Sequence, residues 1–451
     1  MSTIKRIVSI GSTTDEQFRR AADEAARSGA THLVLTRDLP ESTWQFDVPG
    51  DPYPAWFVVQ PGLLKVFCPQ ALQGFLNPDY AARVQDILAK RCAILREYGL
   101  KGAYMTNEPQ VLPEAVFEAH PHWRGPRVDH PFRSRTARFA PCVAKAEVQA
   151  LYHEALATLA KNCPEIDTLF LMTIDSGSGL CWAPALYPGP NGCADCNEGD
   201  FEERAAAFLK MLHAAGVDAG LQLEIDFAEI EPRSWMRKAF PNPARVARLL
   251  PSGLSVNHIE GPDAKPFIRP LSLFGNLFYS AFYPVIGLSH PLALTRQMIA
   301  DAKFGGQRFL CNLGDGSNGE WMFRLYRALL EQDPRTEMAG LNCVQSLASE
   351  EFGAEKGGAL MDAWLALQEA ETQLGSLNFG PYLLMGGLLG RWLTRPLVPI
   401  PQELSEQETS GFLPYLFQAR DRESALNIAD IQAMRMYEGW SGRLLVEQTL
   451  A

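Results

Sequence analysis

The chain has 451 residues, of which 47% are hydrophobic and 21% are charged, and its 41 lysines and arginines face 52 aspartates and glutamates. These proportions are ordinary for a globular protein and exclude a disordered chain, a collagen-like repeat and a long coiled coil. The length allows one large enzymatic domain and a smaller one, and the formal net charge of −11 argues against nucleic-acid binding, which normally needs a basic face.

Neither a secretory signal nor a membrane span is predicted. The apolar run near the start, Ile7–Ile10, is too short for a signal-peptide core. The most apolar longer stretch, Asn378–Gly390, is too short to cross a bilayer and is rich in glycine. We therefore expect a soluble cytoplasmic protein that binds neither membranes nor nucleic acid.

Eight short apolar runs rich in β-branched residues recur along the chain, and helical patterns follow most of them. Strand–helix alternation repeated eight times predicts the α/β class and a parallel sheet, arranged as a (β/α)8 barrel. A doubly wound sheet is the alternative, although the glycine-rich dinucleotide fingerprint is missing after the first run. The eight runs are Ile7–Ile10, His32–Leu35, Ala103–Met105, Thr168–Met172, Leu221–Ile225, Leu254–His258, Leu277–Ala281 and Arg308–Cys311.

Helices are expected where apolar residues recur at helical spacing between the runs. The clearest are Asp15–Ser28, Asp79–Tyr98, Lys145–Asn162 and Phe201–Ala215.

The predicted barrel occupies residues 1–340, with long loops after its second and third strands. Long structured loops in a compact domain are usually functional, and both would lie at the carboxyl ends of the strands. The strand rhythm then stops, and residues 341–451 form a predicted helical region packed on the barrel. Its long helical stretch, Glu423–Leu450, belongs to a region that is a candidate homodimer contact.

Polar residues collect where the predicted strands end. Carboxylates gathered at one mouth of a barrel suit acid–base chemistry on a polar substrate, because a buried unpaired carboxylate is costly. The alternative for each one is a helix cap or an ion-pair partner. These residues are Asp38 after the second strand, Asn107 and Glu108 after the third, Asp175 after the fourth, Glu224 and Asp226 in the fifth, His258 and Glu260 in the sixth, and Asn312 and Asp315 around the end of the eighth.

Glu108 and Asp175 are the leading catalytic carboxylates, since glycoside cleavage typically uses a pair. Asp175 lies in a turn rich in glycine and serine that allows a substrate to come close. Asn107-Glu108-Pro109 resembles the Asn-Glu-Pro of retaining barrel glycosidases, in which the glutamate is the acid/base. That family places the motif at strand four, whereas it follows strand three here.

The loop after the third strand carries four arginines and a histidine between residues 123 and 135. Arginine holds carboxylates with two parallel hydrogen bonds, so Arg127 and Arg133 suit an anionic substrate such as a sugar acid. His130 is a candidate general base or hydroxyl ligand. The alternative is a solvated basic loop.

Aromatic side chains supply a further expectation about sugar binding. Trp182 and Tyr187 lie in a turn-rich loop after the fourth strand, and Tyr283 follows the seventh. Such rings stack against sugars, or else simply anchor their loops.

Nine cysteines, an odd count, are expected to be free thiols in a reducing compartment. Cys193-Ala-Asp-Cys196 is a C-x-x-C pair with Cys181 nearby, but no second pair or histidines follow at zinc-ligand spacing. We therefore expect a plain loop here, no metal ligands and no cofactor.

The acidic barrel with its helical tail resembles the superfamily of (β/α)8 glycoside hydrolases. Within it, the loop after strand three and the asparagine ending strand eight resemble inverting exo-sialidases, and α-glucuronidase-like barrels are comparable. The sialidase resemblance assigns a catalytic histidine to His130 and a carboxylate-holding asparagine to Asn312. Its strand-one aspartate is missing, because Asp15 is a helix-start residue, and Asp38 is the substitute.

The sequence thus predicts a metal-independent exo-glycosidase that cleaves a small acidic oligosaccharide or glycoside. A general acid would protonate the leaving oxygen while a second group activates water or attacks directly. Two alternatives remain: a barrel lyase or isomerase acting on a sugar acid, and a catalytically inert carbohydrate-binding barrel. A metal-dependent hydrolase is disfavoured because the chain contains no H-E-x-x-H motif.

Overall fold

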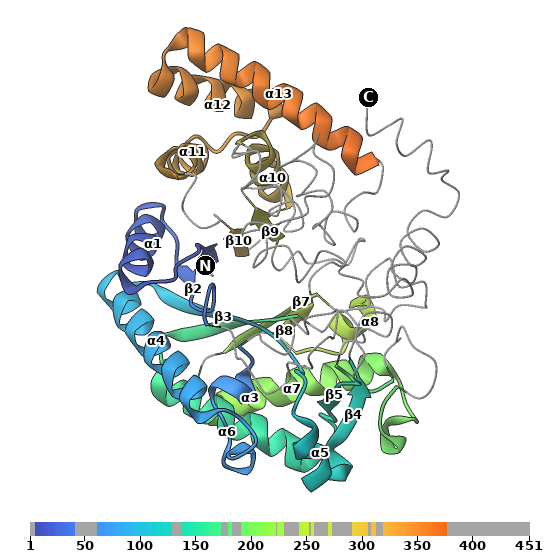
Figure 1. The fold of residues 1–451 in the computed structure, drawn as a ribbon. Coiled ribbons are helices and arrows are strands. Elements are labelled where there is room, and N and C mark those ends of the chain that lie inside the picture. Colours follow the sequence, from blue (N-terminus) through green and yellow to red (C-terminus); the bar gives the residue numbers. More distant parts are fainter. Residues whose placement is uncertain are drawn as a thin grey trace, which may run out of the picture. The chain divides into compact units, whose positions relative to one another are not determined.

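The computed structural model describes residues 5–40, 61–128, 137–172, 179–182, 191–221, 223–229, 243–251, 254–256, 269–272, 291–304, 308–312 and 319–376. The chain divides into two compact units (Figure 1). The first unit is Met1–Arg269 with Gly306–Leu310, and the second is Pro270–Gly305 with Cys311–Ala451. The domain boundary expected at residue 340 falls inside a helix, α12 (Glu337–Phe352).

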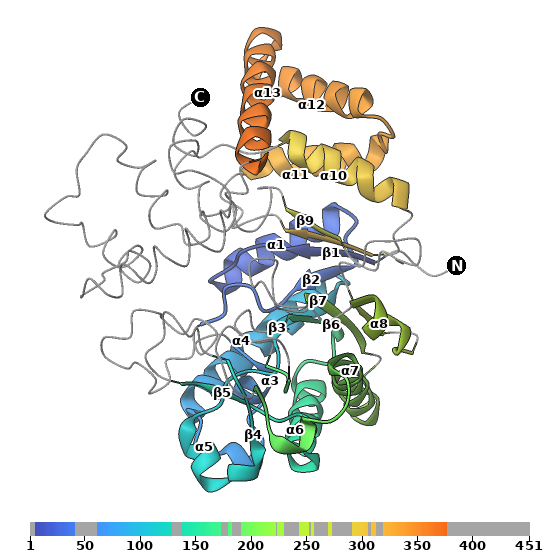
Figure 2. The same ribbon diagram turned by 90° about the vertical axis from the view of Figure 1, so that its right-hand side faces the viewer.

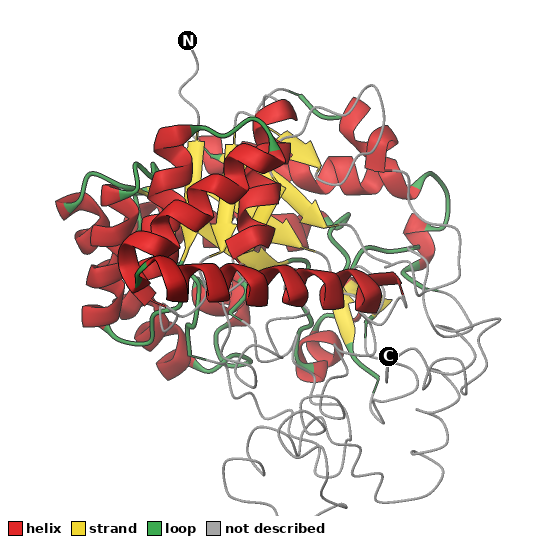
Figure 3. Cartoon of the chain, turned by 90° about the horizontal axis from the view of Figure 1, so that it is seen from above, coloured by secondary structure: helices red, strands yellow, loops and turns green. Residues whose placement is uncertain are grey.

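Eight strands form one sheet in the order β8-β7-β6-β3-β2-β1-β10-β9. Figure 3 shows strands in yellow and helices in red. Five pairs of neighbouring strands run parallel: β1–β2, β2–β3, β3–β6, β6–β7 and β7–β8. This confirms the α/β class and the parallel sheet. The strands are β1 (Lys5–Ser9), β2 (His32–Val34), β3 (Lys101–Asn107), β6 (Ile166–Met172), β7 (Glu224–Glu229), β8 (Leu254–Val256), β9 (Arg269–Ser272) and β10 (Arg308–Asn312).

The strand order is informative about the wider architecture. The first strand, β1, has β2 on one side and the last strand, β10, on the other. Among the described strands, no pairing joins the two ends of the order, β8 and β9. Closure into a (β/α)8 barrel therefore stays a prediction. Of the expected strands, Leu277–Ala281 lies outside the described residues, and β9 was not expected.

Helices of the first unit follow the strands as predicted. The expected helix at Asp15 is confirmed by a capping box, in which the Thr14 side chain accepts from the Gln17 N–H and the Gln17 side chain accepts from the Thr14 N–H. Neighbouring helices α1, α4, α6, α7 and α8 contact one another in chain order, and Figure 2 shows α4, α6 and α7 beside the sheet. The helices are α1 (Asp15–Arg27), α4 (Pro78–Glu97), α6 (Ala146–Asn162), α7 (Phe201–Asp218) and α8 (Pro243–Arg248).

The buried core lies between these elements. Ile7, Val34, Ala103 and Phe170, one from each of four adjacent strands, form a buried cluster with Met105 packed against it. Burial of such side chains stabilises the fold by roughly 25 cal/mol for each Å² of apolar surface removed from water.

The two predicted insertions carry small elements of their own. The insertion after β2 includes α3 (Leu63–Val66) and the short 3₁₀ helix η1 (Gln70–Leu72), while its residues 41–60 lie outside the description. The insertion after β3 includes α5 (Glu114–Ala119), η2 (Pro121–Trp123) and the antiparallel pair β4 (Arg124–Arg127) and β5 (Phe139–Pro141). Residues 129–136, between β4 and β5, are not described.

The described part of the second unit is mostly helical and also includes residues 270–272 of β9 and 311–312 of β10. Its helices α10 (Pro291–Phe304), α11 (Gly319–Gln332), α12 and α13 (Ala354–Ser376) contact one another, and Trp321 and Trp364 stack with ring centroids 5.0 Å apart. Helices are thus confirmed after residue 340 as far as Ser376, and the expected helix Glu423–Leu450 lies outside the described residues. None of the helices in the described part of the chain combines the length and apolar character needed to cross a bilayer.

Candidate active site

The carboxyl group of Glu108, directly after β3, accepts hydrogen bonds from three described residues. Its Oε1 accepts hydrogen bonds from the Leu63 N–H at 2.7 Å and the Thr106 hydroxyl at 3.2 Å. Its Oε2 accepts from the Tyr152 hydroxyl at 3.0 Å. The residue is only 1% exposed. An ionised carboxylate can accept about four hydrogen bonds, and the Glu108 carboxylate accepts three from these residues.

Three separate segments meet at this carboxyl group. Thr106 belongs to β3 itself, Leu63 begins α3 in the insertion after β2, and Tyr152 comes from the buried face of α6. Tyr152 is fixed by an edge-on contact with Phe208 of α7, with ring centroids 5.4 Å apart. The insertion after β2 therefore reaches the carboxyl end of β3, where barrel and other α/β enzymes build their sites.

Burial dominates the electrostatics of Glu108. Loss of water raises the pKa of its carboxyl to about 6, even though the hydrogen bonds from Leu63 and Tyr152 and the charge of Lys65 favour the ionised form. Lys65 is itself buried, at 2% exposure. Burial lowers the pKa of its ammonium group well below the ordinary value, and the charge of Glu108 acts against that change. A carboxyl group with this pKa exchanges protons near neutral pH.

The Gln110 side chain adds an unsatisfied amide two residues from Glu108. It is 4% exposed, and neither its Oε1 nor its Nε2 finds a hydrogen-bond partner among the described residues. A Cβ atom on Gly62 would lie 2.4 Å from this Oε1, so the chain passes the amide closely only because residue 62 is glycine. An unpaired buried amide costs about 1–3 kcal/mol, a cost that a polar ligand would relieve.

Four other predicted residues are described at or near the strand ends. Asn107 is buried at the end of β3, and Arg127 ends β4 at the base of the arginine loop. Asp38 lies exposed after β2, where its Oδ2 accepts from the Ser12 N–H at 2.9 Å. Trp182 donates its indole N–H to the Cys193 carbonyl at 2.9 Å, so this ring anchors its loop.

Glu224 was expected near the carboxyl end of the fifth strand, and this prediction is wrong. The fifth strand was expected at Leu221–Ile225, but β7 begins at Glu224 because α7 runs on to Asp218. Glu224 therefore lies at the amino end of its strand, where it pairs with Lys5 at 3.1 Å. Asp226 lies within β7, and Asn312 ends β10.

The remaining predicted site residues lie outside the described residues, so their positions stay predictions. This group includes one of the two proposed catalytic carboxylates and the catalytic histidine. They are His130, Arg133, Asp175, Tyr187, His258, Glu260, Tyr283 and Asp315.

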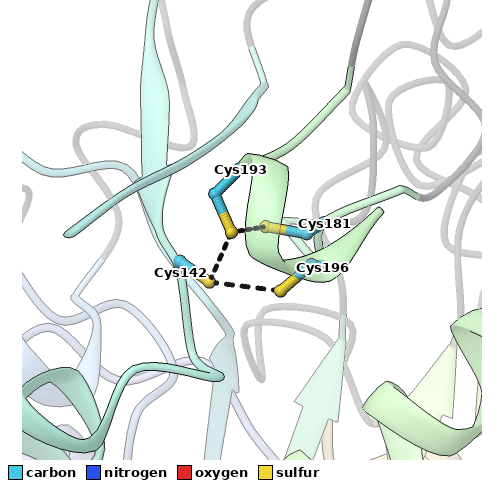
Figure 4. Close-up of side chains that lie close together, drawn as sticks. All are labelled: Cys142, Cys181, Cys193 and Cys196. Atoms are coloured by element: carbon cyan, nitrogen blue, oxygen red, sulfur yellow. Dashed lines mark hydrogen bonds between the residues drawn. The ribbon is translucent and has the colours of Figure 1, made fainter. Parts of the chain in front are cut away.

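Four cysteines of the first unit form a cluster (Figure 4). The Sγ atom of Cys142 is 3.3 Å from that of Cys193 and 3.6 Å from that of Cys196, and the Cys181 and Cys193 sulfurs are 4.0 Å apart. A hydrogen bond from Cys181, the largest influence, lowers the pKa of the Cys142 thiol to about 5. Two further cysteine sulfurs, those of Cys142 and Cys181, thus lie close to the C-x-x-C pair.

Sequence reasoning missed Cys142, Lys65 and Tyr152. For Cys142 one signal was present, because five of the nine cysteines fall between residues 142 and 196. Lys65 and Tyr152 gave no signal, since a lysine in an apolar stretch and a tyrosine on a helix are both ordinary.

No protein-family model and no curated protein matches the chain. Several solved structures of glycoside hydrolases are similar to it. A GH138 enzyme that targets pectin rhamnogalacturonan II has a TM-score of 0.43 at 10% identity, covering 85% of this chain and 55% of that one. An O-GlcNAc hydrolase mutant from Thermobaculum terrenum has a TM-score of 0.43 at 8% identity, covering 99% and 87%.

The maltogenic α-amylase AmyB from Thermotoga neapolitana has a TM-score of 0.40 at 9% identity, covering 75% of this chain and 78% of that one. This chain thus spans about half the length of the pectin-targeting enzyme. With TM-scores below 0.5, these likenesses carry no argument about the activity of this chain.

Proposed function

We propose that the chain is a glycoside hydrolase in which Glu108 is the general acid/base. The observation that carries the proposal is the desolvated carboxyl group of Glu108 at the carboxyl end of β3, with a pKa of about 6. Enzymes tune a catalytic glutamate into this range by burial so that it both gives and takes a proton near neutral pH.

The hydrogen bonds to Glu108 favour one oxygen as the proton carrier. Within the described part of the chain, Oε1 accepts two hydrogen bonds, whereas Oε2 accepts only that of Tyr152. Oε2 keeps the remaining lone pair, so the protonated acid would donate from this atom to the leaving oxygen of a glycoside. Gln110, with both amide atoms unpaired, would hydrogen-bond hydroxyl groups of the sugar.

Asp175 is the proposed second carboxylate, acting as base or nucleophile. Asn107 of β3 is the register partner of Met172 of β6, and Asp175 follows Met172 by three residues. On the far side of that segment, a Cβ atom on Gly179 would lie 2.4 Å from the Pro109 carbonyl oxygen. The segment that holds Asp175 thus begins and ends beside residues 107–109.

The proposed architecture is a closed (β/α)8 barrel. A doubly wound sheet reverses its strand order at one point, whereas here β1 lies between the next strand and the last. This ring-like order supports closure between β8 and β9, and would place the carboxyl ends of all the strands around one mouth.

The proposed substrate is a small oligosaccharide or glycoside with an acidic group, cleaved from its end. Arg127 lies at the base of the arginine loop, and with Arg133 and His130 it would bind that group. Losing an arginine that pairs with a buried carboxylate costs on the order of 2–5 kcal/mol. Arg127→Ala and Arg133→Ala should therefore lower kcat/KM for an acidic glycoside far more than for its neutral analogue. If the ratio of kcat/KM for the acidic glycoside to kcat/KM for its neutral analogue were unchanged in both variants, the proposal of an acidic substrate would be wrong.

The test of the activity is a hydrolysis screen with chromogenic glycosides, acidic and neutral, on wild type and Glu108→Gln. Glu165→Gln is the matched control. Glu165 is also a buried carboxylate, but it lies just before β6, at the amino ends of the strands, whereas Glu108 lies at their carboxyl ends. We expect hydrolysis by wild type and the control and a large loss in Glu108→Gln. If wild type and both variants bind a glycoside but none of them hydrolyses it, the result would instead favour the inert carbohydrate-binding alternative.

Lys65 favours a second candidate function, a lyase acting on a sugar acid. Burial lowers the pKa of its amine, and desolvation of this kind activates lysines that form Schiff bases with carbonyl substrates. Borohydride reduction in the presence of a keto sugar acid would then leave a covalent adduct on wild type but not on Lys65→Met. An unsaturated or cleaved product without water incorporation would favour this reaction over hydrolysis.

A further inference from the structure

We propose that Cys142, Cys181, Cys193 and Cys196 together bind one zinc ion as four thiolate ligands. A tetrahedral zinc site with Zn–S bonds of about 2.3 Å separates its sulfur atoms by about 3.8 Å. The sulfur–sulfur distances of 3.3, 3.6 and 4.0 Å bracket that value, and all four sulfurs lie within 4.8 Å of one another. The site is inferred from these residues alone and does not depend on the proposed glycosidase activity.

The arrangement of the sulfurs suits a common centre better than two disulfides. Cys142 lies close to both Cys193 and Cys196, while Cys193 also lies close to Cys181. All four are free cysteines, with three buried and Cys193 partly exposed. Four thiolates and no open position are the mark of a structural zinc site, whereas catalytic sites keep one position for water or substrate.

Backbone contacts hold the four cysteines in place. The Cys142 N–H donates to the Trp123 carbonyl at 2.7 Å, and the Cys196 N–H donates to the Cys193 carbonyl at 3.2 Å, which forms the tight turn of the C-x-x-C pair. Gly192 has φ +151, and a Cβ atom there would lie 2.7 Å from the Cβ of Cys181. The close approach of Gly192 to Cys181 brings the C-x-x-C segment and the segment of Cys181 near enough to share one metal ion.

The surroundings can offset the charge of such a site. One Zn²⁺ with four thiolates carries a net charge of about −2. The Lys145 backbone N–H donates to the Cys142 carbonyl, and its ammonium pairs with Asp195 inside the C-x-x-C pair. The guanidinium of Arg204 donates to the Cys181 carbonyl at 3.1 Å. Two cations thus lie on residues that contact the ligand-bearing segments.

The proposed zinc ion would join three segments of the first unit. Cys142 directly follows β5, at the base of the arginine loop, and the C-x-x-C pair precedes α7. Cys181 lies two residues after Gly179, whose backbone packs against Pro109. The ion would therefore fix the loop after β6 against the residue that follows Glu108, and its loss should loosen both loops around that carboxyl group.

The test is metal analysis of the full-length protein, purified without chelator and with reductant. We expect about one equivalent of zinc per chain by mass spectrometry of the metal content, retained through gel filtration. Cys142→Ser and Cys196→Ser should each lose most of it. Cys343→Ser is the matched control, since Cys343 is buried in α12 and belongs to no such cluster among the described residues, and it should keep the full equivalent.

Cobalt replacement tests the same site in case the serine variants do not fold. Wild-type protein refolded with Co²⁺ should show the strong visible bands of a tetrahedral thiolate complex. Their absence, or zinc content near zero after growth in zinc-supplemented medium, would overturn the proposal. One equivalent of iron would overturn the choice of zinc. In protein purified separately without reductant and then denatured, a count of four fewer thiols than the nine cysteines would instead show two disulfides.

Discussion

Glu108 should make the stability of the protein depend on pH in a way that Glu108→Gln removes. Burial raises the pKa of this carboxyl from 4.5 to about 6, and a difference of this size corresponds to about 2 kcal/mol. The folded state therefore holds the proton more tightly than the unfolded state does. This contribution to stability is fully present below pH 4.5 and is lost as the pH rises through 6.

Glutamine at position 108 is a clean replacement, because it is neutral at every pH and has the same shape. Its Oε1 can still accept from the Leu63 N–H and the Thr106 hydroxyl, and its Nε2 can donate to the Tyr152 hydroxyl oxygen. The variant should therefore be at least as stable as wild type at neutral pH. Glu108→Ala would leave the Leu63 N–H and the Tyr152 hydroxyl without this partner, while the Thr106 hydroxyl can still donate to the Pro61 carbonyl at 3.4 Å. Each buried unsatisfied donor costs about 1–3 kcal/mol.

The assay is urea unfolding of wild type and Glu108→Gln at several values between about pH 4 and 8, compared as differences in unfolding free energy. We expect the difference to change by about 2 kcal/mol between the acidic and neutral ends, in favour of the variant at neutral pH. A difference that stays constant across this range would refute the reasoning about burial.

Three further changes test other contacts of the first unit. Arg91→Leu should destabilise the protein by several kcal/mol in urea unfolding, because the buried guanidinium donates to the carbonyls of Leu35, Arg37 and Ser12; a loss under about 0.5 kcal/mol would contradict this. Gly179→Ala should lower activity through local strain, since φ is +74 and the Pro109 carbonyl leaves no room for a Cβ; unchanged kcat/KM would speak against a close fit. Asp167→Asn should remove stability that wild type gains above the folded pKa of this carboxyl. Burial alone would raise that pKa, but the hydrogen bond from His32 and the charge of Lys5 lower it, so this stability is lost as the pH falls; equal acid sensitivity of wild type and variant would contradict it.

Local signals in the sequence predicted most of the secondary structure. The helix at Asp15 was predicted because apolar residues recur at helical spacing and Gly29, which has φ +67, follows its end. Strands β1, β2, β3, β6 and β10 were found because a buried strand of a parallel sheet is a short continuous apolar run. Such runs do not fix where a strand starts, which is why Glu224 was assigned to the wrong end of β7.

The candidate site was predictable only in part. Glu108 was found because it follows a strand directly. Its surroundings were not, because Leu63, Lys65 and Tyr152 reach it from segments about 45 residues away on either side, and no local pattern records such contacts. The cysteine cluster was missed for the same reason: Cys142 lies 51 residues before Cys193, beyond the spacing of compact zinc motifs.

The role of Glu108 as general acid is tested most directly by the leaving-group dependence of hydrolysis. Wild type, Glu108→Gln and Glu165→Gln would be compared on two glycosides with the same sugar, one with a poor leaving group and one with an activated phenol. An activated phenol leaves without a proton, so we predict a loss in kcat/KM of about a hundredfold or more on the poor leaving group and a much smaller loss on the phenol. Near-normal hydrolysis of the poor leaving group by Glu108→Gln would contradict the account, and so would the same loss in Glu165→Gln.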